Sequence, residues 1–148
     1  MIFNNYKAFP RSGCIIGLDW GARRCGAAVS DFGRDFVFLR PVINVKNQAE
    51  LVNYVLRLIQ EEGAVGIVLG LPLHADGTDS ETTTLVREFA DMLSKQTDLP
   101  ILLVEENLTS SAAQEELHTR NVSKIKQELD SISARIILEN AIALIKRN

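Results

Sequence analysis

The chain has 148 residues, 46% hydrophobic and 24% charged, with a formal net charge of −3. This length and composition favour one globular domain with its own hydrophobic core. No apolar run approaches the length of a membrane span, and the N-terminus lacks the apolar stretch of a signal peptide, so we expect a cytoplasmic protein with no membrane partner. The negative charge argues against a protein that coats nucleic acid, but not against an enzyme that contacts it locally.

The N-terminal half predicts three strands, a helix and a fourth strand. Residues 1–12 are expected to be a flexible extension. The three strands cover residues 13–19, 25–30 and 36–43, with a tight turn over 20–24 and with Pro41 ending the third strand or placing it at a sheet edge. Asn47 caps a helix that Gly63 ends, and the apolar run 64–70 is typical of a strand buried on both faces. Cys14 and Cys25 lie in strand-like segments without metal-site spacing, which predicts buried free thiols.

The C-terminal half continues the alternation of helix and strand. Thr78 and Glu81 form a candidate capping box for a helix with an apolar face, and a buried strand follows over residues 101–106. A Ser/Thr cluster at 109–111 predicts a short helix to about residue 117, and the last helix is expected over 130–145.

This order of elements predicts an α/β fold with a mixed five-stranded sheet flanked by helices. Functional crevices of such sheets lie outside the carboxyl ends of the parallel strands. Asp19, Gly70 and the pair Glu105–Glu106 stand at three such ends, so we expect them to open into one crevice, with Gly70 against its floor. Taken alone, Asp19 beside a glycine turn is equally typical of an exposed hairpin.

Carboxylates from separate strand ends repel one another unless a cation lies between them. Mg²⁺ or Mn²⁺ prefers oxygen ligands of this kind. Glu105 and Glu106 are adjacent, so only one of them can point into a given site. Asp130 is a third candidate, although an aspartate at the start of a helix also serves as a cap.

Four segments in order, "GLDWGARRCGAAVSD", "IVLGLPLHADGT", "EENLTS" and "LDSISARIIL", resemble the YqgF family of bacterial proteins. This family is assigned to pre-16S ribosomal RNA nucleases and was formerly assigned to Holliday junction resolvases. The resemblance runs from about Gly13 to Ile145. It implies a ribonuclease H-like fold and a divalent-metal nuclease.

Carried over to this chain, the resemblance implies Asp19, Glu106 and Asp130 as the catalytic and metal-binding carboxylates, which selects Glu106 over Glu105. It implies phosphodiester hydrolysis, with precursor 16S ribosomal RNA as the expected substrate and ribosomal particles as possible partners. One position departs from the family pattern. Asn107 stands where the family commonly has arginine, so a phosphate or carboxylate contact made by that arginine would be weakened here.

Weaker candidates surround the acidic set. Gly21 would let a phosphate approach the backbone closely, and Arg23 and Arg24 could hold it, although a solvated turn explains these arginines equally well. The basic stretch 118–126 holds Arg120, Lys124 and Lys126, which could track a nucleic-acid backbone or simply be solvated. His74 could contact substrate, but it is more typical of a plain loop histidine.

Three alternatives stay open at this point. The same chemistry would serve a Holliday junction resolvase, which needs a two-fold dimer. The helix stripes at 47–62 and 80–95 are only wide enough for the core, which favours a monomer. A non-catalytic binding module would keep the fold without the reaction. The strand–turn–strand start also matches actin-like phosphate-binding domains, but 148 residues leave little room for their second domain.

Overall fold

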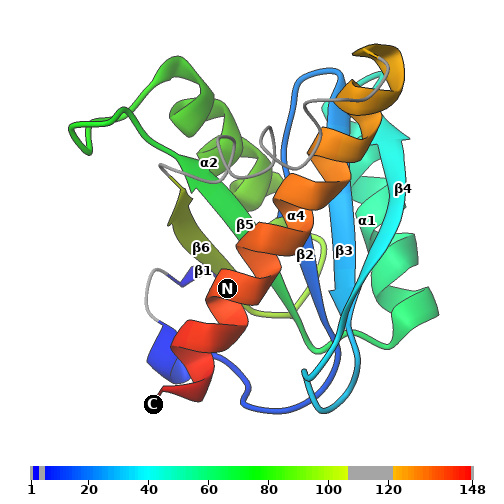
Figure 1. Cartoon of the computed structure of the whole chain (residues 1–148), viewed down its shortest axis with the longest axis vertical. Helices are drawn as coiled ribbons and strands as arrows, with labels where there is room; N and C mark the ends of the chain where they lie inside the picture. Colours follow the sequence, from blue (N-terminus) through cyan, green and yellow to red (C-terminus); the bar gives the residue numbers. More distant parts are fainter. Residues whose placement is uncertain (1, 4–5, 107–121, 148) are drawn as a thin grey trace.

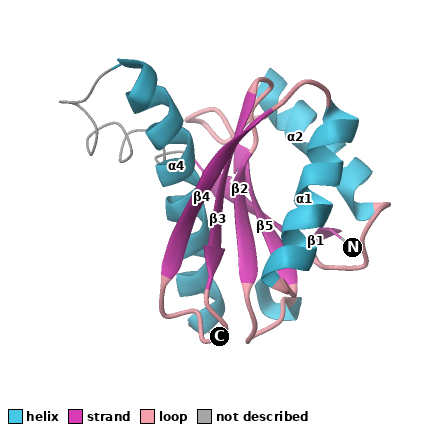
Figure 2. Ribbon diagram, turned by 90° about the vertical axis from the view of Figure 1, so that its right-hand side faces the viewer, coloured by secondary structure: helices cyan, strands magenta, loops and turns pink. Residues whose placement is uncertain are grey.

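The computed structural model describes residues 2–3, 6–106 and 122–147, with only the backbone described for Phe3 and for residues 122–131. The described part has three layers (Figures 1 and 2): a mixed sheet with α4 on one face and α1 and α2 on the other. The strands are β1 (Ile2–Phe3), β2 (Ile15–Asp19), β3 (Arg24–Ser30), β4 (Val37–Asn44), β5 (Gly66–Pro72) and β6 (Ile101–Glu106). The helices are the short 3-10 helix η1 (Tyr6–Ala8), α1 (Gln48–Glu62), α2 (Glu81–Ser94) and α4 (Val122–Lys146).

The strand order is β1-β6-β5-β2-β3-β4. β2, β3 and β4 form an antiparallel meander, and β2, β5 and β6 run parallel. β5 is buried from Gly66 to Leu71 because helices cover both faces of the sheet, as its continuous apolar run predicted. The five predicted strands are confirmed, and β1 adds a two-residue pairing beside β6.

The two helices on one face begin at side-chain caps. Asn47 accepts a hydrogen bond from the Glu50 amide at 2.8 Å, and Gly63 ends α1 with a left-handed backbone (φ 64°), both as predicted. The predicted cap of α2 is wrong. Ser80 is the cap, paired with Thr83, because the Thr78 side chain is already bonded to Asp76 in the preceding turn.

The last helix is longer than predicted. α4 begins at Val122, so the expectation that Asp130 stands at the helix start is wrong. Asp130 lies within the helix, which also excludes the alternative that it is the N-cap. The prediction followed the dense apolar run from Ile132 onward and overlooked Val122, Ile125 and Leu129, which already have helical spacing among good helix formers such as Lys, Gln and Glu. Ala134, Ile137, Leu138 and Ala141 pack α4 onto the sheet.

The N-terminal segment is not a flexible extension in its described residues, which corrects that expectation. Ile2 pairs with Ile101 of β6, and Phe9 is only 2% exposed, in the cluster beneath α4. The sequence pattern missed this packing because the segment is short and its apolar residues have no regular period.

Both cysteines are free, as predicted, and Cys25 is buried as expected, whereas Cys14 is only half-buried. Burial is the main cause that raises the pKa of Cys14, with Glu62 adding to it. None of the helices among the described residues has the length and apolar character that a membrane crossing requires.

Candidate active site at the carboxyl ends of β2, β5 and β6

Asp19 is the last residue of β2 and points to the α4 face of the sheet. A side chain added at Gly17 would meet Ala134 and Leu138 of α4, and strand alternation places Asp19 on the same face. Leu18 pairs with Leu69, so the next residues along the two parallel strands, Asp19 and Gly70, are also neighbours. The half-buried Asp19 carboxylate therefore stands at the carboxyl edge, next to a position without a side chain.

Glu106 reaches the same place from β6. A Cβ added at Gly70 would lie 3.0 Å from both Cδ and Oε1 of Glu106 and 2.6 Å from Cδ1 of Ile137 on α4. Glu106 therefore lies over Gly70, on the face that carries Asp19. Glu105 alternates to the other face and is exposed. The structure thus brings Asp19, Gly70 and Glu106 together, and Gly70 makes room for the glutamate.

The third predicted carboxylate can be placed only by its backbone. Asp130 lies in α4, three, four and seven residues before Ser133, Ala134 and Ile137, which are all buried. Its side chain is outside the described part of the structure. Among the side chains that are described, no group of three His, Cys, Asp or Glu residues gathers in a metal-binding arrangement.

Thr83 of α2 fixes the carboxyl end of β5. This residue was not identified from the sequence. Its side chain is fully buried, accepts a hydrogen bond from the Ser80 amide at 2.8 Å and donates to the Pro72 carbonyl. Pro72 is the cross-strand partner of Glu106, so the capping box also fixes the strand end beside the glutamate. The available signal was the pair Ser80 and Thr83, three residues apart before an apolar face.

The turn after Asp19 requires a glycine at position 21 for its own geometry, whether or not a ligand binds there. A Cβ at Gly21 would collide with the Arg24 carbonyl oxygen, so this residue must be glycine for the turn to close. Arg23 is exposed and its carbonyl accepts a hydrogen bond from the Val45 amide at 2.8 Å, while Arg24 is half-buried at the start of β3. Both arginines lie at the edge that carries Asp19.

The loop between β5 and α2 forms a small hairpin beyond the same edge. Leu73 pairs with Asp79, and the His74 amide donates to the Thr78 carbonyl at 2.9 Å. Hydrogen bonds from Thr78 lower the pKa of Asp76. His74 is exposed, which fits either a substrate contact or a plain loop histidine.

Several predicted features fall outside what the structure describes. These are Asn107, the short helix at 109–117, Arg120, and the side chains of Lys124 and Lys126. The backbone of Lys124 and Lys126 belongs to the first turns of α4.

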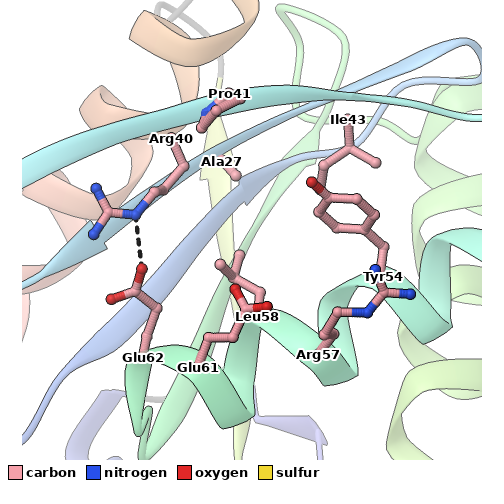
Figure 3. A pocket seen from close by; sticks show the side chains of 9 residues that line it. All are labelled: Ala27, Arg40, Pro41, Ile43, Tyr54, Arg57, Leu58, Glu61 and Glu62. Atoms are coloured by element: carbon pink, nitrogen blue, oxygen red, sulfur yellow. Dashed lines mark hydrogen bonds and ion pairs between the residues drawn. The ribbon is translucent and has the colours of Figure 1, made fainter.

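A separate hollow of about 260 Å³ lies on the other face of the sheet, between β4 and α1. Figure 3 shows the ion pair at its end, in which Arg40 Nε lies 2.7 Å from Glu62 Oε1. Tyr54 and Arg57 of α1 line the other side, with the guanidinium 5.6 Å from the ring centre. Neither Asp19 nor Glu106, the two predicted carboxylates whose side chains are described, lines this hollow, which distinguishes it from the candidate active site.

The fold is similar to that of ribonuclease H-like resolvases. A structure entitled "T. thermophilus RuvC in complex with Holliday junction substrate" matches 90% of this chain and 94% of its own, with a TM-score of 0.56 and 10% identity. The yeast mitochondrial Holliday junction resolvase Ydc2 matches 94% of this chain and 82% of its own, with a TM-score of 0.54 and 15% identity. At these identities the likeness establishes the ribonuclease H-like fold.

The sequence comparison narrows this class to one family. The sequence model of the RuvX family, described as "Holliday junction resolvase", matches residues 13–143. A Maridesulfovibrio salexigens protein named "Putative pre-16S rRNA nuclease" is 40% identical over 87% of this chain and 97% of its own length. A Rickettsia canadensis protein of the same name is 33% identical over 99% of both chains. The chain belongs to the RuvX family, also called YqgF, which confirms the resemblance and makes it a nuclease.

Proposed function

We propose that this chain is a divalent-metal-dependent nuclease that uses Asp19, Glu106 and Asp130 as its catalytic carboxylates. The observation that supports this most is the convergence of Asp19 and Glu106 on Gly70, from two strand ends that are 87 residues apart in sequence. Asp130 occupies the helical stripe that leads through Ala134 and Ile137 to the same face. A purely structural role would not require a glycine that opens space for one of the carboxylates.

The donor set fits a hard divalent cation such as Mg²⁺ or Mn²⁺. All three side chains offer carboxylate oxygens, and the absence of a side chain at Gly70 lets the Glu106 carboxylate lie over the strand end beside Asp19. A bound cation of this kind would polarise the phosphodiester and favour ionisation of an attacking water. Asp19 would anchor it from β2, Glu106 from β6 and Asp130 from α4.

The substrate that we propose is precursor 16S ribosomal RNA, cut as a single strand, with ribosomal particles as partners. The names of the curated relatives support this choice, as does a net charge of −3, which does not suit a broad DNA-binding face. Arg23 and Arg24 at the site and Lys124 and Lys126 on α4 would bind backbone phosphates. The second candidate is a four-way DNA junction, which the description of the family model favours.

A paired cleavage assay tests both parts of the proposal. The purified protein is incubated with precursor ribosomal RNA and, separately, with a mobile four-way junction, in Mg²⁺ or in a chelator. We expect RNA to be cut faster than the junction, in metal only, and the Asp19→Asn variant to be folded but nearly inactive on both. Symmetric cutting of the junction with intact RNA would overturn the substrate, and a fully active Asp19→Asn variant would overturn the site.

A further inference from the structure

The edge strand β4 and the hairpin before it carry an unusual share of exposed apolar side chains. Of the seven large hydrophobic residues that are exposed in the described part of the chain, four lie within residues 32–39: Phe32 (74% exposed), Phe36 (65%), Phe38 (48%) and Leu39 (43%). Scattered exposed apolar residues are normal, but a cluster on an open sheet edge is a site at which another strand can pair.

The backbone of this segment leaves specific groups at the open edge. The Asp31 amide donates to the Phe36 carbonyl at 3.2 Å, so Phe36 bonds inward to the end of β3. Phe38 and Arg40, which pair with Val29 and Ala27, lie two and four residues after Phe36 and therefore also bond toward β3. The residues between them, Val37 and Leu39, therefore direct their N–H and C=O groups outward.

The next position on this side ends the ladder. Pro41 follows Leu39 by two residues, where the pairing of β3 and β4 becomes irregular, and it has no N–H to donate. An added strand could thus form its hydrogen bonds at Val37 and Leu39 but not beyond Leu39. This restriction selects a short pairing with a defined register.

The charges of the segment favour an antiparallel copy over a parallel one. Asp31 and Asp35 lie at the hairpin end. Arg40, which forms an ion pair with Glu62 at 2.7 Å, lies at the other end of the segment. An antiparallel second copy keeps the acidic hairpins of the two chains apart, whereas a parallel copy would place like charges side by side.

We propose that two copies of this chain pair through β4, antiparallel and two-fold symmetric, with Phe38 of each copy opposite Phe38 of the other. In this register Val37 of one chain exchanges both backbone hydrogen bonds with Leu39 of the second copy, and Phe36 faces Arg40 across the ladder. Phe36 and Phe38 of both copies then form one aromatic cluster on the α1 face. The helix stripes, on which the monomer expectation rested, take no part in this contact.

This arrangement leaves the proposed catalytic sites independent of each other. In each copy, β3 and β4 lie between β2 and the two-fold axis. Because the two sheets pair antiparallel, the carboxyl ends of the two β2 strands point in opposite directions along the joined sheet. The pairing is therefore compatible with one cut in one strand of RNA at each site. Its test is separate from the cleavage assay, since it measures mass and not activity.

Matched lysine substitutions test the surface. Leu39 on β4 and Leu85 on α2 are both 43% exposed, so Leu39→Lys and Leu85→Lys add the same charge at equal exposure. Light-scattering mass is measured over a range of concentrations, with melting temperature as the folding control. We expect a wild-type dimer that Leu39→Lys abolishes and Leu85→Lys preserves. A wild-type protein that stays monomeric at every concentration, or a dimer that survives Leu39→Lys, overturns the proposal.

Two single-cysteine variants test the register independently of the lysine variants. Residues opposite each other in a non-hydrogen-bonded antiparallel pair have Cα atoms about 4.5 Å apart, which is within disulfide reach. Under mild oxidation Phe38→Cys should form a covalent dimer, whereas Phe36→Cys should not, because residue 36 faces residue 40. Wild-type protein controls for Cys14 and Cys25. Cross-linking of Phe36→Cys to the same extent, or no cross-link at residue 38, contradicts this register.

Discussion

Gly70 shows how the candidate site depends on a position that has no side chain. It is a strand residue in the middle of a buried sheet, where glycine weakens the strand and marks a close approach of another group. The close groups here are the Glu106 carboxylate and Ile137 of α4. The glycine therefore serves the carboxylate cluster rather than the backbone conformation.

Replacing Gly70 with alanine should impair the site more than the fold. The new Cβ would approach Oε1 of Glu106 to 3.0 Å and Cδ1 of Ile137 to 2.6 Å, so both side chains must move. We expect nuclease activity to fall at least about tenfold, since displaced metal-site groups commonly cost that much. The measurement is the cleavage rate at saturating Mg²⁺, together with the melting temperature.

Gly63→Ala is the matched control for this variant. Gly63 has a left-handed backbone (φ 64°) and no atom within 4 Å of an added Cβ, so alanine there strains the backbone without touching the site. It should lower the free energy of unfolding by about 1 kcal/mol and leave the cleavage rate unchanged. If the two variants lose activity equally, Gly70 has no special relation to Glu106.

At the scale of elements, one buried arginine joins three segments. Arg34 is 3% exposed and donates hydrogen bonds to the carbonyls of Gly13 (2.8 Å), Pro10 (2.6 Å) and Ser12 (3.1 Å). Its own carbonyl accepts a hydrogen bond from Lys146 Nζ at 2.9 Å. It thereby holds the N-terminal segment to the β3–β4 hairpin and the end of α4. Burial lowers the pKa of Arg34.

Arg34→Met should destabilise the protein while leaving the distant site intact. It removes three hydrogen bonds to backbone carbonyls, which we expect to lower the free energy of unfolding by about 2–4 kcal/mol. Arg57→Met on the exposed face of α1 is the control and should change it by less than about 0.5 kcal/mol. Denaturant unfolding measures both. Equal stability of the two variants would show that the Arg34 contacts contribute little.

The elements also show which features the sequence could predict. The order of strands was enough to place Asp19 and the Glu105–Glu106 pair at one edge, and strand alternation showed that only one of the two glutamates can face the site. The family resemblance was needed to select Glu106. Asn47 and Gly63 were readable because a cap is a local interaction. The cap of α2 was misassigned because Thr78 and Ser80 are both suitable cap residues and the Asp76 turn decides between them. The packing of residues 6–12 depends on Arg34, a contact across more than 20 residues that no local pattern reveals.

At the scale of the whole molecule, the three layers separate two surfaces. Asp19 and Glu106 lie at the carboxyl ends of β2 and β6, whereas β4 is the outer strand of the sheet, beyond β3 (Figure 1). Since the strands between them are buried and rigidly paired, a partner at β4 would not cover the carboxylates. The layers therefore allow metal binding, substrate binding and self-association to be measured separately.

The most direct test of the central claim compares two neighbouring glutamates. Glu105→Gln and Glu106→Gln remove the same charge from adjacent residues of β6 that point to opposite faces of the sheet. Mn²⁺ binding is measured by calorimetry, and RNA cleavage is measured on the same samples. We predict that Glu106→Gln weakens Mn²⁺ binding about tenfold or more and nearly abolishes cleavage, while Glu105→Gln matches the wild type in both. Wild-type Mn²⁺ affinity in Glu106→Gln, or an equal loss in Glu105→Gln, would contradict the assignment of the site.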